Sequence, residues 1–115
     1  MANPIQATQA QNDTTIARLA GSLTVINAPD MRVGLLDAIK QTNPKILALN
    51  LADVDFVDSS ALGVFVEARR QMVANDGKVT FTNVNADIRG LMRIMNLESV
   101  FSFVDDEAEL LSASE

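Results

Sequence analysis

With 115 residues the chain is long enough for one hydrophobic core but not for two, so we expect a single domain over residues 1–115. The absence of histidine and cysteine excludes disulfides, ordinary zinc sites and any catalytic scheme that uses histidine as a base. The formal net charge of −6, from 9 basic and 15 acidic residues, argues against a surface that neutralises nucleic-acid phosphates. Any link to nucleic acid must therefore run through another protein.

The composition also bears on the core and on the location of the protein. Hydrophobic residues make up 48% of the chain but aromatic residues only 4%, so the core is expected to be aliphatic. No window approaches the roughly 18 uninterrupted apolar residues of a membrane span. Residues 1–4 lack the basic and apolar segments of a signal peptide. We expect a cytoplasmic protein without membrane insertion.

The chain begins with the pattern of a β-hairpin. Residues 5–11 alternate loosely between apolar and polar, and residues 14–20 alternate more clearly. The turn signal Asn12-Asp13 lies between them. Gly21 is expected to end the second strand.

A helix and a buried strand follow the hairpin. Asn27 is expected to cap the helix, and Pro44 to end it, because the residue before a proline disfavours the helical region. Between them, apolar residues recur at helical spacing: Met31, Leu35, Leu36 and Ile39. Residues 46–51 are almost continuously apolar, which predicts a central parallel strand covered on both faces.

The second half of the chain repeats the alternation of helix and strand. Residues 60–74 show helical spacing and stop at residues 75–77, a C-terminal signal of Asn, Asp and Gly. Strict alternation predicts a strand over residues 78–84. Asn85 is expected to cap a helix that carries four apolar residues: Ile88, Leu91, Met92 and Met95.

The last two elements are short. Residues 100–104 predict a strand, and the acidic residues 105–107 open a final helix. Leu110 and Leu111 are expected to dock this helix.

These elements predict an α/β fold. The strand, helix, strand order implies right-handed parallel crossovers, so the sheet should be mixed and mainly parallel. We expect a single domain of about 4–5 strands with about 4 helices packed around them. Segments 1–4 and 112–115 are expected to fray.

Four sets of residues are interpreted as structural and not as functional sites. Asp53, Asp55 and Asp58 lack the glycine and terminal glutamate of an EF-hand, so we expect solvated loop charges and no metal site. The glycines form no phosphate-cradling motif, and no cofactor is expected. One set of methionines is interpreted as core filling: Met31, Met72, Met92 and Met95. One set of arginines is interpreted as solvated helix faces with packed stems, rather than as a basic patch: Arg69, Arg70, Arg89 and Arg93.

The residues Asp58-Ser59-Ser60 lie at the junction between strand 46–51 and helix 60–74. One interpretation is that one of the three is simply the N-cap of the helix. The other is functional, because free backbone N–H groups and the helix dipole at such a junction favour a phosphate near Ser59. The residues alone leave both interpretations open.

The sequence around this junction, Val54-Asp55-Phe56-Val57-Asp58-Ser59-Ser60-Ala61-Leu62-Gly63, resembles the phosphorylation loop of the STAS-domain anti-sigma factor antagonists. The resemblance covers roughly residues 14–110 and includes blocks at residues 19–23, 46–51 and 88–97. Three positions depart from the family pattern. Ala61 and Asn96 stand where the family usually has glycine, and Thr24 stands where aspartate is frequent.

The resemblance implies a STAS-like domain that is not an enzyme. It implies that the protein binds an anti-sigma factor serine kinase when unphosphorylated, is released on phosphorylation of Ser59, and is restored by a serine phosphatase. The implied partner-binding residues surround the acceptor: Asp55, Phe56, Asp58, Ser59 and Ser60. Two alternatives remain: a STAS module that binds another partner, such as a transporter subunit or signalling enzyme, and a nucleotide-binding regulatory domain.

Phe56 is the residue of this set whose placement is least determined by the pattern. It lies between two aspartates, so it is either buried beneath the loop or exposed as a partner contact. We expect burial, because aromatic residues are scarce in this chain.

Overall fold

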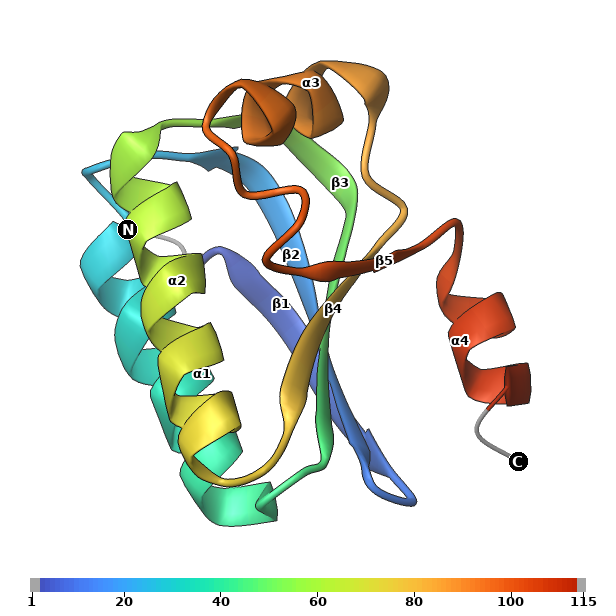
Figure 1. The fold of residues 1–115 in the computed structure, drawn as a ribbon. Coiled ribbons are helices and arrows are strands. Elements are labelled where there is room, and N and C mark those ends of the chain that lie inside the picture. The colour runs from blue at the N-terminus through green and yellow to red at the C-terminus, as the bar shows by residue number, and fades with distance from the viewer. Residues whose placement is uncertain (1–2, 114–115) are drawn as a thin grey trace.

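The computed structural model describes residues 3–113, which form nine elements (Figure 1). In chain order these are β1 (Ile5–Gln11), β2 (Thr14–Leu23), α1 (Ala28–Thr42), β3 (Ile46–Val57), α2 (Ser59–Ala74), β4 (Lys78–Thr82), α3 (Ala86–Ile94), β5 (Ser102–Val104) and α4 (Glu107–Ala113).

The five strands form one sheet in the order β1-β2-β3-β4-β5. β1 and β2 are antiparallel, whereas the three later pairs are parallel and are each connected through a helix. α1 and α2 lie side by side against one face of the sheet, and α4 lies on the other side (Figure 1). The prediction of a single α/β domain with a mixed, mainly parallel sheet is confirmed.

The main core lies between the sheet and the helices α1 and α2. Its largest buried side chains include Phe65 and Phe81, whose rings meet edge to face with centroids 5.1 Å apart. Such a pair contributes about 0.5–1.5 kcal/mol beyond its burial. Six residues of this core are all at most 4% exposed: Leu47, Leu49, Leu62, Phe65, Val79 and Phe81.

A smaller cluster lies on the opposite face of the sheet, under α4. It consists of Ile16, Ala48 and Leu110, with Leu111 half-buried beside them. The predicted docking of the last helix by its leucines is therefore confirmed. Because side chains alternate across a strand, Ile16 and Ala48 face α4 while their neighbours face the main core.

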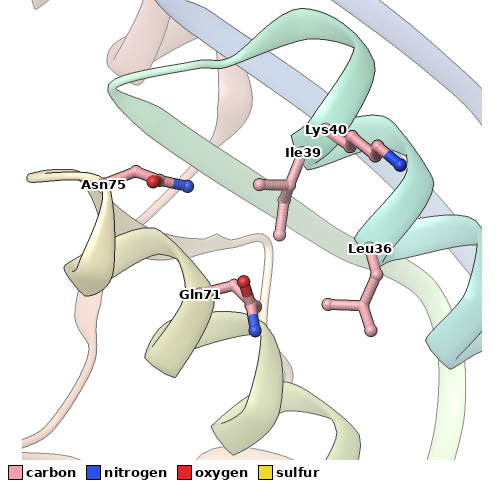
Figure 2. Close-up of a pocket in the computed structure, with 5 residues that line it drawn as sticks. All are labelled: Leu36, Ile39, Lys40, Gln71 and Asn75. Carbon is pink, nitrogen blue, oxygen red and sulfur yellow. The ribbon is translucent and has the colours of Figure 1, made fainter.

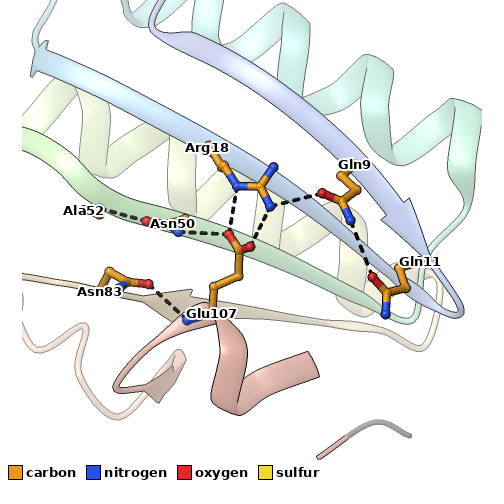
Figure 3. Close-up of polar contacts among 7 residues, drawn as sticks. All are labelled: Gln9, Gln11, Arg18, Asn50, Ala52, Asn83 and Glu107. Carbon is orange, nitrogen blue, oxygen red and sulfur yellow. Dashed lines mark hydrogen bonds and ion pairs between the residues drawn. The ribbon is translucent and has the colours of Figure 1, made fainter. Parts of the chain in front are cut away.

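A polar network ties α4 to the sheet (Figure 3). Arg18 donates from Nε to Glu107 Oε1 at 3.0 Å and from Nη2 to Oε2 at 2.5 Å. Asn50 donates to the same Oε1 at 2.9 Å, and the Glu107 N–H donates to Asn83 Oδ1 at 3.1 Å. The hydrogen bond from Arg18 is the main reason that the pKa of Glu107 lies below its ordinary value.

Strands β2 and β3 extend further than the sequence predicted. Gly21 was expected to end the second strand, but with φ +88° it lies inside β2, which continues to Leu23. The register between the strands shifts on either side of it, so the strand absorbs the left-handed residue as an irregularity. β3 runs to Val57 instead of Leu51, because residues 53–57 pair with the end of β2.

Other boundaries are shorter than predicted. β4 ends at Thr82, since Asn83 takes a left-handed φ of +58°. β5 begins only at Ser102. α3 ends at Ile94, which leaves Met95 47% exposed and makes its expected core role wrong, whereas the other three methionines of that set are fully buried.

The expected helix caps differ in outcome. Asn85 Oδ1 accepts a hydrogen bond from the N–H of Ile88 at 2.8 Å, so its predicted capping role is confirmed. Asn27 holds the N-cap position of α1, but its side chain does not cap the helix. It accepts instead from the N–H of Thr24 at 2.9 Å and donates to the carbonyl of Ser22, which closes the turn before α1.

Of the two end segments, residues 1–2 and 114–115 lie outside the described residues. Pro4 is buried, and its carbonyl accepts a hydrogen bond from the N–H of Ala20 at 2.9 Å. Ser112 lies within α4.

Candidate functional site

The predicted site lies where β2 and β3 end and the helices α1 and α2 begin. The two strand ends are held together, because the N–H of Asp58 donates to the carbonyl of Leu23 at 3.0 Å. The short connection between β3 and α2 therefore adjoins the turn between β2 and α1. Ligand sites of parallel sheets commonly form at this edge, outside the carboxyl ends of the strands.

Asp58 is the N-cap of α2. Its backbone is extended (φ −108°, ψ −177°), and its Oδ1 accepts a hydrogen bond from the N–H of Ala61 at 3.1 Å. Its other carboxylate oxygen, Oδ2, accepts from the N–H of Val25 at 2.9 Å. Both oxygens are thus engaged, and among the three cap candidates the structure selects Asp58.

Ser59 is the first residue of α2, and its side chain is exposed. Within residues 3–113 its hydroxyl makes no hydrogen bond. Ser60 is half-buried and faces a recess between the two helices. Of the two hydroxyls, that of Ser59 is therefore the more accessible to a modifying enzyme.

Asp55 lies at the surface of β3 beside the end of β2. Its Oδ1 accepts a hydrogen bond from the hydroxyl of Ser22 at 2.8 Å, and both side chains are exposed. This contact leaves the second oxygen of Asp55 to solvent or to a partner.

The side chain of Phe56 is 52% exposed, so the expectation of burial is wrong. Val54 and Val57 take the buried positions at this end of β3. The register shift between Gly21 and Ser22 breaks the simple alternation, so Asp55 and Phe56 are exposed in succession.

Two further apolar residues are exposed in the turn that follows the end of β2, the strand end that pairs with Phe56 and Val57. Val25 and Ile26, in the turn between β2 and α1, are each 65% exposed. Together with Phe56 they form what we call the apolar triplet. The exposure of Val25 and Ile26 was not predicted from the sequence, although two apolar residues directly before a helix cap were a usable signal.

An apolar recess of about 300 Å³ lies between the N-terminal ends of α1 and α2. It is lined by Val25, Ala28, Pro29, Arg32, Ser60 and Val64. At its rim Arg32 forms an ion pair with Glu67 at 2.7 Å, and the hydrogen bond from Arg32 lowers the pKa of Glu67. Of the residues discussed above, Val25 of the apolar triplet and Ser60 line this recess.

A second recess of about 300 Å³ lies at the opposite ends of α1 and α2 (Figure 2). It is lined by Leu36, Ile39, Lys40, Gln71 and Asn75. Because helix C-termini present carbonyl groups, this recess offers an anion no free backbone N–H groups.

The aspartates do not gather around a common point. Within residues 3–113 no three Asp, Glu, His or Cys side chains come together as candidate metal ligands. In that same part of the chain, no helix is long and apolar enough to span a membrane.

Three of the four arginines that were expected to lie on solvated helix faces make side-chain contacts within the protein: Arg69, Arg89 and Arg93. Arg69 donates to the carbonyl of Val100 at 2.9 Å. Arg89 and Arg93 both pair with Glu98, at 3.4 and 3.2 Å, and Arg89 also lies 3.9 Å above the ring of Phe103. These contacts support the interpretation that they do not form a basic patch.

The structure shows a specific backbone conformation or hydrogen bond at each of the three positions that depart from the family pattern. Asn96 takes a left-handed φ of +60°, so it serves where glycine is the usual choice. Ala61 is fully buried and donates its N–H to Asp58. Thr24 accepts a hydrogen bond from the N–H of Ile26 at 3.2 Å, within the turn that carries the apolar triplet.

Comparison with known proteins supports the resemblance. The STAS domain family model matches residues 5–110. The anti-sigma F factor antagonist of Paenibacillus polymyxa is 26% identical over 100 residues, covering 87% of this chain and 86% of that protein. The anti-sigma-B factor antagonist of Bacillus subtilis is 28% identical over 96 residues, covering 84% and 85%.

Solved structures share the fold at lower identity. A Planctomyces limnophilus anti-sigma-factor antagonist (STAS) domain protein has a TM-score of 0.85 at 15% identity, covering 93% of this chain and 95% of that one. The phosphorylated form of the Bacillus cell fate determinant SpoIIAA has a TM-score of 0.72 at 22% identity, covering 95% and 100%. A sulfate transporter family protein from Wolinella succinogenes has a TM-score of 0.77 at 18% identity, covering 91% and 87%.

Proposed function

Because the chain belongs to the STAS domain family, we propose that it is an anti-sigma factor antagonist, a regulatory protein rather than an enzyme. In this proposal it acts in the cytoplasm and binds an anti-sigma factor serine kinase while Ser59 is unphosphorylated. Phosphorylation of Ser59 by that kinase releases it, and a serine phosphatase restores the binding form. The names of the Paenibacillus and Bacillus relatives support this function.

The observation that carries the proposal is that Asp58 caps the helix, which leaves the hydroxyl of Ser59 free of any structural role within residues 3–113. Asp58 caps α2, so the hydroxyl of Ser59 is not needed for the helix and is exposed at its first residue. A serine that caps a helix is bound to backbone N–H groups, which would oppose its transfer into a kinase active site. Ser59 carries no such bond within the described residues.

The apolar triplet supplies a docking surface beside the acceptor. Exposed aromatic and aliphatic side chains are the usual anchors of protein interfaces, and these three lie on the two segments that Asp58 joins. The recess next to Ser60 is of a size to take an apolar side chain of the partner. The proposed interface therefore comprises Asp55, Phe56, Asp58, Ser59 and Ser60, extended by Val25 and Ile26.

A phosphate on Ser59 is proposed to act through charge at this surface. It adds close to two negative charges beside Asp58 and near Asp55, in a chain whose net charge is already −6. At a desolvated interface, a penalty of about 3 kcal/mol weakens binding more than a hundredfold.

The proposal is tested with the anti-sigma factor kinase of the source cell. Calorimetry should show tight binding of unphosphorylated protein and at least about hundredfold weaker binding after incubation with kinase and ATP. Loss of the phosphate on treatment with a serine phosphatase should restore the affinity. Equal affinities of the two forms would refute the switch.

A second candidate function is a STAS module with another partner, such as a transporter subunit or signalling enzyme. The likeness to the Wolinella sulfate transporter family protein favours keeping it, because the two chains share the fold. Affinity purification from the source cell with unphosphorylated protein separates the two functions through the partner recovered. Titration with nucleotides, with and without Mg²⁺, tests the remaining candidate, a nucleotide-binding regulatory domain.

A further inference from the structure

The outer edge of β1 is a free sheet edge. β1 is the first strand in the sheet order and pairs only with β2. Five of its seven residues are exposed, and no described residue pairs with its outer side. About every second backbone N–H and C=O of an edge strand points away from its neighbour, where another strand can bind it.

Over residues 7–11 this edge lacks the features that usually prevent pairing. β1 contains no charged residue and no proline, and its sequence is IQATQAQ. The only irregularity lies between Ile5 and Ala7, and residues 7–11 keep a regular one-to-one register with β2. By contrast, β5 at the other edge has only three residues, all half-buried. The two edges of the sheet therefore differ in their capacity to recruit a strand.

We propose that the outer edge of β1 pairs with β1 of a second copy of this chain, antiparallel and about a two-fold axis. Identical antiparallel edges satisfy each other's hydrogen bonds under such an axis, so one surface serves both copies. The chain as a whole carries a charge of −6, and a charged edge would repel its own copy. The uncharged β1 is thus suited to self-association.

The side chains of β1 fit this arrangement on both faces of the sheet. Thr8 and Ala10 are small residues that lie opposite Ala17 and Thr15 of β2, on the face of the sheet that α1 and α2 cover. On the other face Gln9 and Gln11 interact through their amides at 3.4 Å, and both lie at the sheet edge (Figure 3). Amide groups both donate and accept, so they can also bind the same residues of a second copy.

The expected dimer is weak and leaves the Ser59 site open. One strand pair buries less than the roughly 800 Å² per partner of a standard interface, so a dissociation constant in the micromolar range or above is expected. Because β1 is antiparallel to β2, its regular part ends at Gln11, opposite Thr14 at the start of β2. Ser59 lies beyond the other end of β2, so this proposal and the proposed function can fail separately.

Analytical ultracentrifugation of the unmodified chain over micromolar to millimolar concentrations should show a monomer–dimer equilibrium. The variant Thr8→Lys/Ala10→Lys places lysines opposite one another in the dimer. If the two-fold axis passes through residue 8, position 8 of one copy faces position 8 of the other. If it passes through residue 9, position 8 of each copy faces position 10 of the other. The variant should weaken dimerisation by about tenfold or more. The control Val33→Lys/Val73→Lys adds the same charge at exposed helix positions, 58% and 49% exposed, and should dimerise like the unmodified chain.

A second pair of measurements does not depend on loss of binding. Native mass spectrometry of Thr8→Lys/Ala10→Lys mixed with Thr8→Glu/Ala10→Glu should show heterodimers in excess of either homodimer. Hydrogen exchange of the unmodified chain should slow in residues 5–11 as concentration rises, which needs no variant to fold. A monomer at all concentrations, protection that rises elsewhere but not in β1, or assemblies larger than the closed dimer would each overturn the proposal.

Discussion

The carboxylate of Asp58 accepts a hydrogen bond from the N–H of Val25 at 2.9 Å, across 33 positions of the chain. Its other oxygen caps α2 through Ala61. One side chain therefore fixes both segments of the proposed interface, the turn before α1 and the start of α2. The exposed Ser59 and the apolar triplet are held in a common arrangement by this residue.

Replacement of Asp58 by alanine should lower the free energy of unfolding by about 1–2 kcal/mol, because it removes a helix cap and the exposed hydrogen bond to the N–H of Val25. Urea denaturation measures the loss. Asp55→Ala serves as the control, since Asp55 is exposed and makes only a surface hydrogen bond, and it should change stability by less than about 0.5 kcal/mol. Equal effects of the two substitutions would contradict the structural role of Asp58.

Ser59, and not Ser60, should be the phosphate acceptor. Incubation with the cognate kinase and ATP should label the chain and Ser60→Ala, but not Ser59→Ala, as phosphopeptide mapping can determine. Ser59→Ala should retain partner binding, whereas Ser59→Asp should weaken it through its charge. Normal labelling of Ser59→Ala would show that the acceptor is elsewhere.

Phe56→Ala should weaken partner binding by about 1–3 kcal/mol with little change in stability, because the ring is 52% exposed and contributes little to the core. Calorimetry against the kinase and thermal unfolding separate the two effects. Val73→Ala, at an exposed position near the far end of α2, is the matched control and should bind normally. A large loss of stability in Phe56→Ala would indicate a buried ring instead.

Phosphorylation of Ser59 should leave the fold and its stability nearly unchanged. A phosphate at the N-terminus of α2 gains about 0.3–1 kcal/mol from the helix dipole, and repulsion from Asp58 opposes it by a similar amount. The change in unfolding free energy should stay within about 1 kcal/mol, as thermal melts can show. Amide NMR shifts spread throughout the sheet would require a conformational switch in place of the electrostatic one.

Stability should fall in acid partly through Glu107. Its pKa in the folded protein is lowered, chiefly by the hydrogen bond from Arg18, so the folded state favours the ionised form. This contribution is fully present above the ordinary pKa of about 4.5 and is lost as the pH falls through the lower folded value. Denaturation of the unmodified chain and of Glu107→Gln from neutral pH to about pH 3 should show a stability difference that shrinks in acid. A constant difference would mean that the charge of Glu107 does not stabilise the folded state.

The sequence by itself determined the order of the elements and the place of the candidate site. Periods of two and of 3.6 residues are local, so the helices, the buried strand at Leu47 and Leu49 and the cap at Asn85 were readable without the fold. The same holds for the junction that carries Ser59, because a strand pattern followed by a helix pattern is itself a local signal. The uncharged composition of β1 is likewise visible in the sequence.

Only the tertiary structure decided how residues 53–58 are presented. Their extension of β3 depends on pairing with the end of β2, and the exposure of Phe56 depends on a register shift at Ser22. Neither follows from the residues of β3 alone. At a register shift, the pairing with the neighbouring strand decides which side chains face the core and which face solvent. The second hydrogen bond of Asp58 joins it to Val25 for the same reason: the two segments meet only because parallel pairing of β2 and β3 brings their carboxyl ends to one edge of the sheet.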